Sequence, residues 1–319
     1  MAVYTEVTDD AVVAFLADYD IGSAVAFRGI AEGVENSNYS LRTTQGDFIL
    51  TLYEKRVDPT ELPWFLALME HLSTHGILCP LPVKARDGES LRHLCERPAA
   101  VTTFLPGVWP RRVRIEHCGP VGKALAAMHL GGSTFAPTRR NALGPDDWPP
   151  LWDRTRKGAG DLLPTPAKEI DAALESILDR WPAGLPTGHI HADLFPDNVF
   201  FLAGEVSGLI DFYFAATDIL AYDIAVCLNA WCFEQDFAFN VTKGRALLRS
   251  YQSLRPLSAQ ELASLPVLCQ GAAIRFLLTR LYDWVNTPAG ALVTRKDPQE
   301  YLRKLRFHLS AMDEHAYGL

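Results

Sequence analysis

The sequence predicts an α+β protein of two lobes, with a small antiparallel sheet in the first and mainly helices in the second. Three observations predict this fold class. Short apolar runs separated by polar turns dominate the first hundred residues, helical periodicities dominate the rest, and TFLPGVWP between them carries Pro106, Gly107 and Pro110. We therefore place an N-terminal lobe at 1–105 and a C-terminal lobe at 106–319.

The N-terminal lobe is expected to hold a hairpin, one helix and two further extended segments. Two strand-like runs flank a polar, glycine-containing turn at 43–47, which is typical of an antiparallel hairpin. The stretch DPTELPWFLALMEHLSTHGI then has apolar residues near helical spacing, and Gly76 marks the expected end of that helix. The extended runs are 39–42, 48–53, 81–85 and 99–104.

The C-terminal lobe is expected to be mainly helical, with one short hairpin. Two apolar runs, 198–202 and 206–210, flank Ala203–Gly204 as in a tight turn. Residues 131–165 are rich in Gly, Pro and Trp without clear periodicity, so we expect an irregular insertion there. The expected helices are 116–130, 166–181, 220–233 and 271–285. A cleft between two such lobes is a usual place for a small-molecule site.

The composition argues against several classes of function. Thirty basic against 38 acidic side chains give a net charge of −8, which argues against sequence-independent nucleic-acid binding. The N-terminus lacks the basic region of a signal peptide, and no apolar run approaches the length of a membrane span; the most apolar stretch is DIAVCLNAWCF. Six scattered cysteines without a C-x-x-C pair favour free thiols. We therefore expect a cytoplasmic protein that binds neither nucleic acid nor membrane.

The segment GHIHADLFPDNVFF at 188–201 allows two interpretations. In the first, His189-x-His191-x-Asp193 is the start of a metallo-hydrolase signature, because neutral imidazoles suit zinc. Leu194 stands where that signature needs a further histidine, and the remaining histidines show no second clustered pair. A metal-dependent hydrolase therefore stays an alternative without further support.

In the second interpretation the same segment transfers a phosphoryl group. This chemistry needs a carboxylate to accept the proton of the attacking hydroxyl, and oxygen ligands for Mg²⁺; protein kinases place an Asn five residues after the catalytic Asp. Asp193 and Asn198 have that offset, Pro196 favours a loop, and Asp211 ends the next apolar run. Taken singly, Asp193, Asn198 and Asp211 could each be an ordinary turn residue. Together, one hairpin would supply a base and two metal ligands.

Three motifs carry a resemblance to a known family. HADLFPDN at 191–198, IDF at 210–212 and YDIA at 222–225 resemble the aminoglycoside phosphotransferase/choline kinase superfamily, small-molecule relatives of protein kinases. The segments GVENSNYSL, FILTLYEKR, FYFAATDILAYDIAVCLNAWCF and IRFLLTRLYDW are similar to the bacterial homoserine kinases of that superfamily. The resemblance extends from about Ala24 to Trp284. It implies a protein-kinase-like bilobal fold and transfer of the γ-phosphoryl group of Mg-ATP to the side-chain hydroxyl of L-homoserine, a step towards threonine.

The resemblance also implies residue roles. Asp193 is the expected catalytic base, Asn198 and Asp211 are the expected Mg²⁺ ligands, and Asp223 is expected to brace the catalytic loop through backbone N–H groups. His191 is expected to help hold the same loop. Gly29 and Gly33 fall in the loop that would cover the nucleotide phosphates, where small residues permit close backbone approach. The expected ATP-binding residues are Gly33, Ser37, Asn38, Thr51, Lys55, Glu61, Phe104 and Leu105.

Two departures from the protein-kinase pattern affect phosphate binding. Thr51, not lysine, stands on the strand where protein kinases carry their phosphate-binding lysine, and Lys55 lies about 13 Å further along a regular strand. Glu61 is the favoured glutamate to pair with such a lysine, with Glu70 second. Asp211-Phe212-Tyr213 also lacks the glycine of D-F-G, so no activation-loop switch is expected.

A homoserine site needs a cation or backbone donors for the carboxylate and an acceptor for the ammonium group. Arg275 and Arg280 lie in a mostly apolar helical stretch, and each is expected either to bind the substrate carboxylate or to form a salt bridge within the protein. Asp223 and Asp283 are the partners considered for such a salt bridge. Asp218 is the favoured partner of the ammonium group. Asn36 and Tyr213 are further candidates for the substrate site.

Other functions stay open beside homoserine phosphorylation. A choline or aminoglycoside kinase would need an aromatic cage or several acids around the cleft, and neither is excluded by the composition. A non-catalytic, kinase-like binding module is mildly favoured by Thr51 and opposed by the intact Asp193, Asn198 and Asp211. Monomer and homodimer are equally compatible with the sequence.

Overall fold

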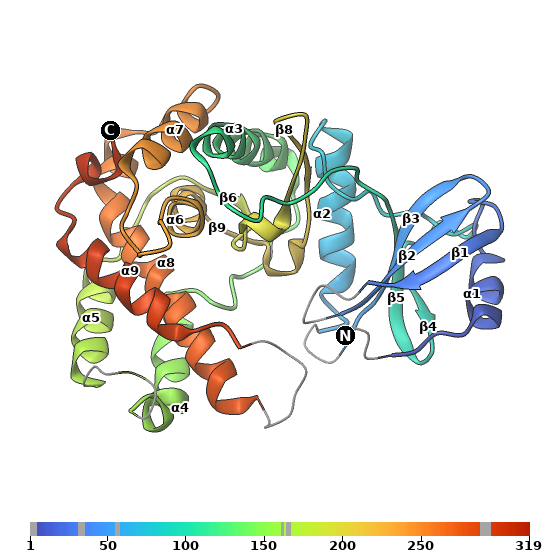
Figure 1. The fold of residues 1–319 in the computed structure, drawn as a ribbon, viewed down its shortest axis with the longest axis horizontal. Helices are drawn as coiled ribbons and strands as arrows, with labels where there is room; N and C mark the ends of the chain where they lie inside the picture. The colour runs from blue at the N-terminus through green and yellow to red at the C-terminus, as the bar shows by residue number, and fades with distance from the viewer. Residues whose placement is uncertain (1–4, 31–35, 55–57, 161–162, 164–166, 288–294) are drawn as a thin grey trace. The chain divides into compact units, whose positions relative to one another are not determined.

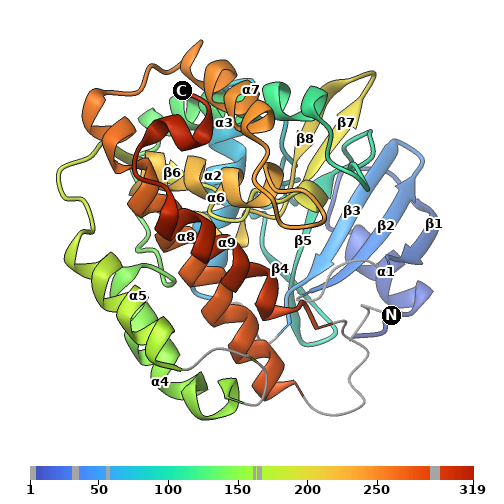
Figure 2. The ribbon, with the colours of Figure 1, turned by 60° about the vertical axis from the view of Figure 1, so that its left-hand side comes forward.

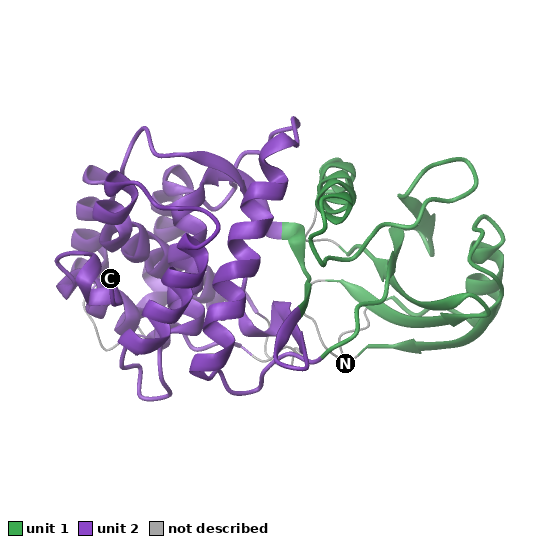
Figure 3. Ribbon diagram, turned by 90° about the horizontal axis from the view of Figure 1, so that it is seen from above, with its two compact units in different colours: residues 1–107, 207–213 green, residues 108–206, 214–319 purple. Residues whose placement is uncertain are grey.

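The computed structural model describes residues 5–30, 36–54, 58–160, 163, 167–287 and 295–319 (Figure 1). The chain divides into two compact units (Figure 3). Unit 1 is Met1–Gly107 with Ser207–Tyr213, and unit 2 is Val108–Val206 with Phe214–Leu319. Unit 1 holds an antiparallel sheet and unit 2 is mostly helical, which confirms the predicted fold class.

Unit 1 is built on a five-stranded sheet. Its strands are β1 (Ala24–Gly29), β2 (Ser37–Thr43), β3 (Gly46–Leu52), β4 (Arg92–Leu94) and β5 (Arg97–Thr103), in the order β1-β2-β3-β5-β4. The predicted hairpin is confirmed, because β2 and β3 pair antiparallel from Ser37–Leu52 to Thr43–Gly46. Alternate residues of β2 are buried, as expected when one face of a strand covers a core.

The helices of unit 1 differ from the expected single helix. α2 (Leu62–Thr74) is the predicted one, and α1 (Asp9–Leu16) is an addition. The hydroxyl of Thr8 caps α1 by accepting the backbone N–H of Ala11, and its apolar side joins the sheet core. The extended run expected at 81–85 forms no regular strand, but it lies antiparallel to β5, where Pro82 bridges to Thr102 and Val83 donates its N–H to the carbonyl of Val101 at 2.8 Å.

Unit 2 holds helices and a small two-stranded sheet, together with one strand of a hairpin whose second strand continues into the 207–213 segment of unit 1. The helices are α3 (Ile115–Gly131), α4 (Trp148–Ala159), α5 (Ala167–Asp179), α6 (Leu220–Trp231), α7 (Val241–Gln252), α8 (Ala259–Asn286) and α9 (Pro298–Ser310). β6 (Thr187–Ile190) pairs antiparallel with β9 (Ala216–Ile219), and β7 (Val199–Leu202) pairs with β8 (Glu205–Leu209). The last pair confirms the hairpin predicted around Ala203–Gly204.

The irregular insertion expected at 131–165 contains a regular helix, α4. Its first turn holds Pro149 and Pro150, where the missing N–H groups cost no helical hydrogen bond. The buried side chains of α4 include Trp148 and Trp152, which face the core of unit 2. The expectation was therefore wrong, because the prolines that obscure the periodicity occupy a position that helices tolerate.

Helix α8 is the central helix of unit 2, with α9 lying alongside it in both ribbon views (Figures 1 and 2). The expectation that no apolar run approaches the length of a membrane span was wrong for this helix. α8 has 28 residues and an 18-residue window of mean hydropathy 1.5, enough by length and composition to cross a membrane. However, 83% of that window is buried inside the protein, as in the core helix of a globular domain. Gly271 lets α8 approach Trp181, since a Cβ there would lie 2.2 Å from the indole.

Candidate active site

The predicted catalytic loop, residues 191–198, connects β6 to β7 in unit 2. Asp193 is partly exposed, and Asn198 ends a 3-10 turn immediately before β7. The amide nitrogen of Asn198 donates to the backbone oxygen of Asp193 at 2.8 Å and to its Oδ2 at 3.2 Å. Because both amide hydrogens are used there, the amide oxygen of Asn198 is the atom left to bind a cation.

The residue before Asp193 is held in an unusual backbone conformation. Ala192 has φ +61°, in the left-handed region that residues with a Cβ rarely adopt. Asp223 on α6 accepts the backbone N–H of Ala192 on Oδ1 at 2.8 Å and that of His191 on Oδ2 at 2.7 Å. The ring Nδ1 of His191 accepts the N–H of Asp193 at 3.3 Å. Two side chains thus fix the loop through its backbone.

Asp223 is itself held by a buried histidine. His129 on α3 places Nε2 3.1 Å from Oδ2 of Asp223 and Nδ1 2.7 Å from the hydroxyl of Tyr251. Burial alone would raise the pKa of Asp223, but His129 and the backbone N–H of His191 hold that pKa below its ordinary value. His129 was not predicted as a site residue, although it follows Val121 and Leu125 on the apolar side of its helix.

Asp211 lies after β8 and belongs to unit 1, whereas Asp193 and Asn198 belong to unit 2. It has φ +65°, a second left-handed residue with a Cβ. Strained backbone of this kind is concentrated at functional sites in proteins. In the chain, Asn198 immediately precedes β7 and Asp211 follows β8 by two residues, so the hairpin connects the two expected metal ligands.

The ATP-site candidates of unit 1 lie mainly on β2 and β3. Asn38 and Thr51 are directly paired in the sheet, and the hydroxyl of Thr51 donates to Oδ1 of Asn38 at 2.8 Å. Ser37 donates to Glu54 at 2.7 Å, and Glu54 also pairs with Arg97 at 3.2 Å. Glu54 was not predicted as a site residue, because its contacts come from strands distant in sequence.

The remaining ATP-site candidates are distributed around the same unit. Glu61 stands at the N-terminal boundary of α2, and Phe104 is 47% exposed beyond β5. Leu105 packs against Gly208, where a Cβ would lie 2.8 Å from the leucine side chain. Gly33 and Lys55 lie outside the described residues.

The substrate-site candidates in unit 1 and on β9 already make contacts within the protein. The hydroxyls of Tyr213 and Tyr53 are 2.9 Å apart, and burial raises the pKa of Tyr213 well above its ordinary value. Asn36 accepts the backbone N–H of Glu54 at 3.3 Å. Asp218 is partly exposed and accepts the amide of Asn141 at 2.8 Å.

The two candidate arginines of α8 also have partners within unit 2. Arg280 pairs with Glu300 at 2.6 Å and donates to the carbonyl of Asp297 at 3.0 Å. Arg275 donates through Nη1 to the carbonyl of Ala192. The contact of Arg280 favours a salt bridge within the protein, although its partner is neither of the two aspartates considered from the sequence. Arg275 also binds protein, but its partner is a backbone carbonyl and not the expected carboxylate.

The hydrolytic metal centre has no support in the geometry. Nε2 of His189 lies 2.8 Å from the carbonyl oxygen of Phe135, and His191 is fully buried with its Nδ1 accepting the N–H of Asp193. Within the described part of the chain, no group of three His, Cys, Asp or Glu side chains is placed to hold a metal ion. The two histidines of the segment therefore support the loop and its surroundings.

Comparison with known proteins identifies the family. Residues 26–257 match the model of the phosphotransferase enzyme family, abbreviated APH. The chain belongs to this family. The prediction of an ATP-dependent phosphotransferase with a hydroxyl acceptor is confirmed, and with it the resemblance on which that prediction rested.

Relatives and solved structures agree with the family. The chain is 67% identical over 319 residues to a protein named homoserine kinase from Granulibacter bethesdensis and 69% identical to another of that name from Acidiphilium cryptum, with all of each chain covered. The structure of amicoumacin kinase hAmiN in complex with AMP-PNP, Ca²⁺ and Ami has a TM-score of 0.73 at 15% identity and covers 97% of both chains. Choline kinase from Cryptosporidium parvum has a TM-score of 0.66 at 13% identity and covers 95% of this chain and 94% of its own. These neighbours confirm the kinase-like fold.

Proposed function

We propose that the protein is a homoserine kinase, which transfers the γ-phosphoryl group of Mg-ATP to the side-chain hydroxyl of L-homoserine. The products are O-phospho-L-homoserine and ADP, on the route to threonine. The observation that carries this proposal is full-length identity of 67% and 69% to proteins named homoserine kinase. Likeness to the choline and amicoumacin kinases supports the fold alone, because those sequences are only 13% and 15% identical.

Asp193 is the proposed base that accepts the proton of the homoserine hydroxyl. Its partly exposed carboxylate follows the fixed peptide of Ala192, so its direction is set before the substrate arrives. A general base in this position accelerates the reaction by about 10²–10⁴-fold. The carboxylate orients the hydroxyl and takes the proton as the oxygen attacks phosphorus.

Asn198 and Asp211 are the proposed Mg²⁺ ligands. An amide oxygen and a carboxylate suit a hard cation, and the hydrogen bonds of Asn198 to Asp193 leave its oxygen for that purpose. When bound, the metal neutralises charge on the nucleotide phosphates. In unit 1 we propose that Ser37, Asn38, Thr51, Glu61, Phe104 and Leu105, with Gly33 and Lys55, bind the nucleotide.

Asp218 is the proposed partner of the substrate ammonium group, because its carboxylate is partly exposed and is oriented by Asn141. Asn36 and Tyr213 remain further candidates. Arg275 and Arg280 already bind groups of the protein, so we assign neither to the substrate carboxylate. All six cysteines are free thiols, which suits a cytoplasmic enzyme, and monomer or homodimer is to be decided by light scattering.

The deciding experiment measures ADP release with Mg-ATP and a panel of acceptors: L-homoserine, L-serine, L-threonine, choline and kanamycin. We expect selective turnover of homoserine and a fall of about 10²–10⁴-fold in the Asp193→Asn variant. If choline or kanamycin were turned over faster than homoserine, the proposed acceptor would be wrong, but the protein would still be an ATP-dependent phosphotransferase. An Asp193→Asn variant as active as the unchanged protein would refute the role of Asp193. Replacing Mg²⁺ by Ca²⁺ in the same assay tests the metal.

A further inference from the structure

Arg275 is one of the largest fully enclosed side chains of the protein, with 2% of its surface exposed. It projects from the middle of α8, and its Nη1 donates to the backbone carbonyl of Ala192. The guanidinium carbon lies 4.2 Å from the ring centroid of Phe276 and 5.6 Å from that of Phe214. Two aromatic faces and one peptide oxygen therefore lie against this guanidinium, and the side chain of Tyr222 is a further neighbour.

This cation has no acidic partner. Among the residues that the structure describes, no carboxylate oxygen lies within 4.0 Å of the Arg275 guanidinium. Its Nε is buried without a hydrogen-bond partner, and so is the hydroxyl of Tyr222. Burial raises the pKa of Tyr222, and the charge and side chain of Arg275 oppose that rise. Burying a charge in this way costs stability, because one carbonyl and two rings replace only part of its hydration.

The carbonyl that Arg275 binds belongs to the left-handed residue of the catalytic loop. The N–H of Ala192 is bound by Asp223 from α6, and its C=O by Arg275 from α8. Two charged side chains from different helices thus hold both polar groups of one residue at φ +61°. Without them, a residue with a Cβ would relax to negative φ, and the direction of the next side chain, Asp193, would change.

We propose that Arg275 is a positioning residue, which aims Asp193 by fixing the peptide between Ala192 and Asp193 in its left-handed geometry. The proposal rests on the proposed function only in that Asp193 is taken as the base. It explains why a buried cation without an acid is present in a helix that would be more stable with an apolar residue there. It also differs from binding of the substrate carboxylate by Arg275, which would act on substrate affinity.

The test is the variant Arg275→Met, which keeps most of the side-chain volume and removes the charge and the donors. We expect kcat to fall about 10²-fold, with the KM values of ATP and homoserine changed less than about threefold, because a misaimed base affects the chemical step. We also expect a melting temperature equal to or above that of the unchanged protein, because an unpaired buried charge has been removed. Arg275→Lys retains one donor and is expected to recover part of kcat.

Two further variants make the result decisive. In the double variant Asp193→Asn/Arg275→Met, the second change is expected to lower kcat less than about twofold below Asp193→Asn alone, since residues acting as a unit are not additive. Lys304→Met removes a buried cation that does have an acidic partner, and is expected to lower the melting temperature while keeping kcat.

Three outcomes would overturn the proposal. A rise in the KM of homoserine at unchanged kcat would make Arg275 a substrate ligand. A fall in kcat matched by an equal loss of folded protein would make Arg275 purely structural. If the two changes lowered kcat independently of each other in the double variant, Arg275 would not act through Asp193. If homoserine is not phosphorylated at all, the proposed function fails, and the same comparison is made on whichever acceptor the unchanged protein uses.

Discussion

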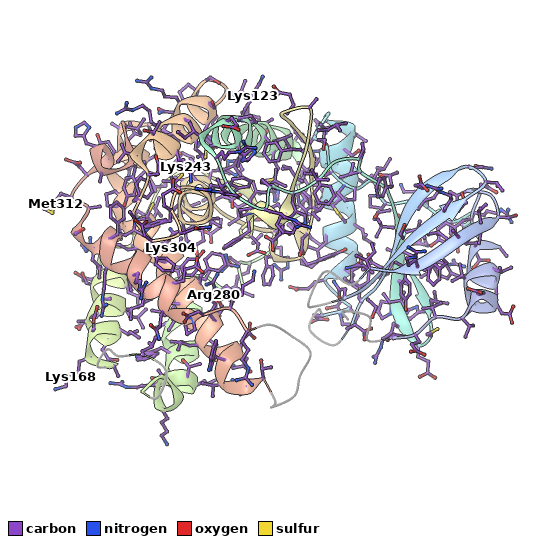
Figure 4. The ribbon with its side chains drawn as sticks, in the orientation of Figure 1. Lys123, Lys168, Lys243, Arg280, Lys304 and Met312 are labelled. Carbon is purple, nitrogen blue, oxygen red and sulfur yellow. The ribbon has the colours of Figure 1, made fainter. Side chains whose placement is uncertain are left out.

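Unit 2 contains two groups of buried charges that differ in what they bind. In the loop brace, made of His129, Asp223 and Arg275, the last two side chains bind the backbone of the predicted catalytic loop, and His129 holds Asp223 in place. The α9 ion cluster, made of Arg280, Glu300 and Lys304, is satisfied mainly by its own members: Glu300 accepts from Arg280 and from Lys304, each at 2.6 Å (Figure 4, where Arg280 and Lys304 are labelled).

The difference separates charges that stabilise the fold from charges that shape the site. In the α9 ion cluster, burial lowers the pKa of Lys304 and Glu300 opposes that effect, so each charge depends on its partner. In the loop brace, Arg275 has a peptide oxygen in place of a carboxylate, and its cost is compensated only if the loop geometry matters to the enzyme. Removing members of each group should therefore have different consequences for stability and for rate.

The largest effect on stability is expected from Asp223→Ala. The change leaves His129 and two backbone N–H groups buried without their acceptor, so the free energy of unfolding should fall by about 3–5 kcal/mol. Urea denaturation measures this loss. Asp153→Ala, which removes an exposed acid from α4, is the control and should change the value by less than about 0.5 kcal/mol. A small loss in Asp223→Ala would mean that the loop holds its shape unaided.

A smaller loss is expected from Lys304→Met. Glu300 keeps Arg280 as a partner, while the backbone carbonyl of Asn229 loses the Lys304 ammonium that lies 2.9 Å away. The free energy of unfolding should fall by about 2–3 kcal/mol, with kcat kept within about twofold. Parallel urea melts and ADP-release assays test this. If Lys304→Met lowered kcat by more than the loss of folded protein explains, the α9 ion cluster would affect the reaction as well as the stability, and the proposed difference between the two groups would be wrong.

The smallest effect concerns pH and the histidine beside the α9 ion cluster. Burial, with a contribution from Lys304, lowers the pKa of His308 from 6.5 to about 3, so the folded protein keeps it neutral while the unfolded chain takes up a proton. Stability from this group is therefore complete above pH 6.5 and is lost as the pH falls towards 3. At pH 5 the loss relative to pH 7 should be about 2 kcal/mol.

The variant His308→Gln isolates that contribution. Glutamine can still hydrogen-bond the side chain of Asn229 but does not titrate, so the difference in unfolding free energy between pH 5 and pH 7 should shrink by about 2 kcal/mol. Urea melts at the two pH values provide the measurement. An unchanged pH dependence would show that His308 is not neutral in the folded protein or that another group dominates this window.

The sequence predicts those parts of the molecule whose chemistry is local. Asp193 and Asn198 are five residues apart in one loop, and their mutual hydrogen bond needs no distant element. The β2–β3 and β7–β8 hairpins follow from alternating runs around a turn. The fold class and the enzyme family could therefore be predicted from short motifs and from the spacing of apolar residues.

The parts that escaped prediction depend on contacts between distant positions. The hydrogen bond from Arg275 to Ala192 spans 83 residues, and the contact of His129 with Asp223 spans 94. No spacing in the sequence reveals which peptide a buried arginine meets. Some local signals were also missed or misread. Thr8 is a clear N-cap, yet helix α1 was not predicted, and the prolines in the first turn of α4 concealed the helical spacing of its apolar residues.

The return of Ser207–Tyr213 to unit 1 has a consequence for biosynthesis on the ribosome. Leu209 donates its N–H to the carbonyl of Leu78 at 2.8 Å, and Ser207 binds the carbonyl of Pro106 at 2.6 Å, so these late residues complete a unit begun at the other end of the chain. The nascent N-terminal unit must wait until about a hundred further residues have been synthesised. Unit 1 can therefore be completed only after the intervening segment 108–206 of unit 2 has been synthesised.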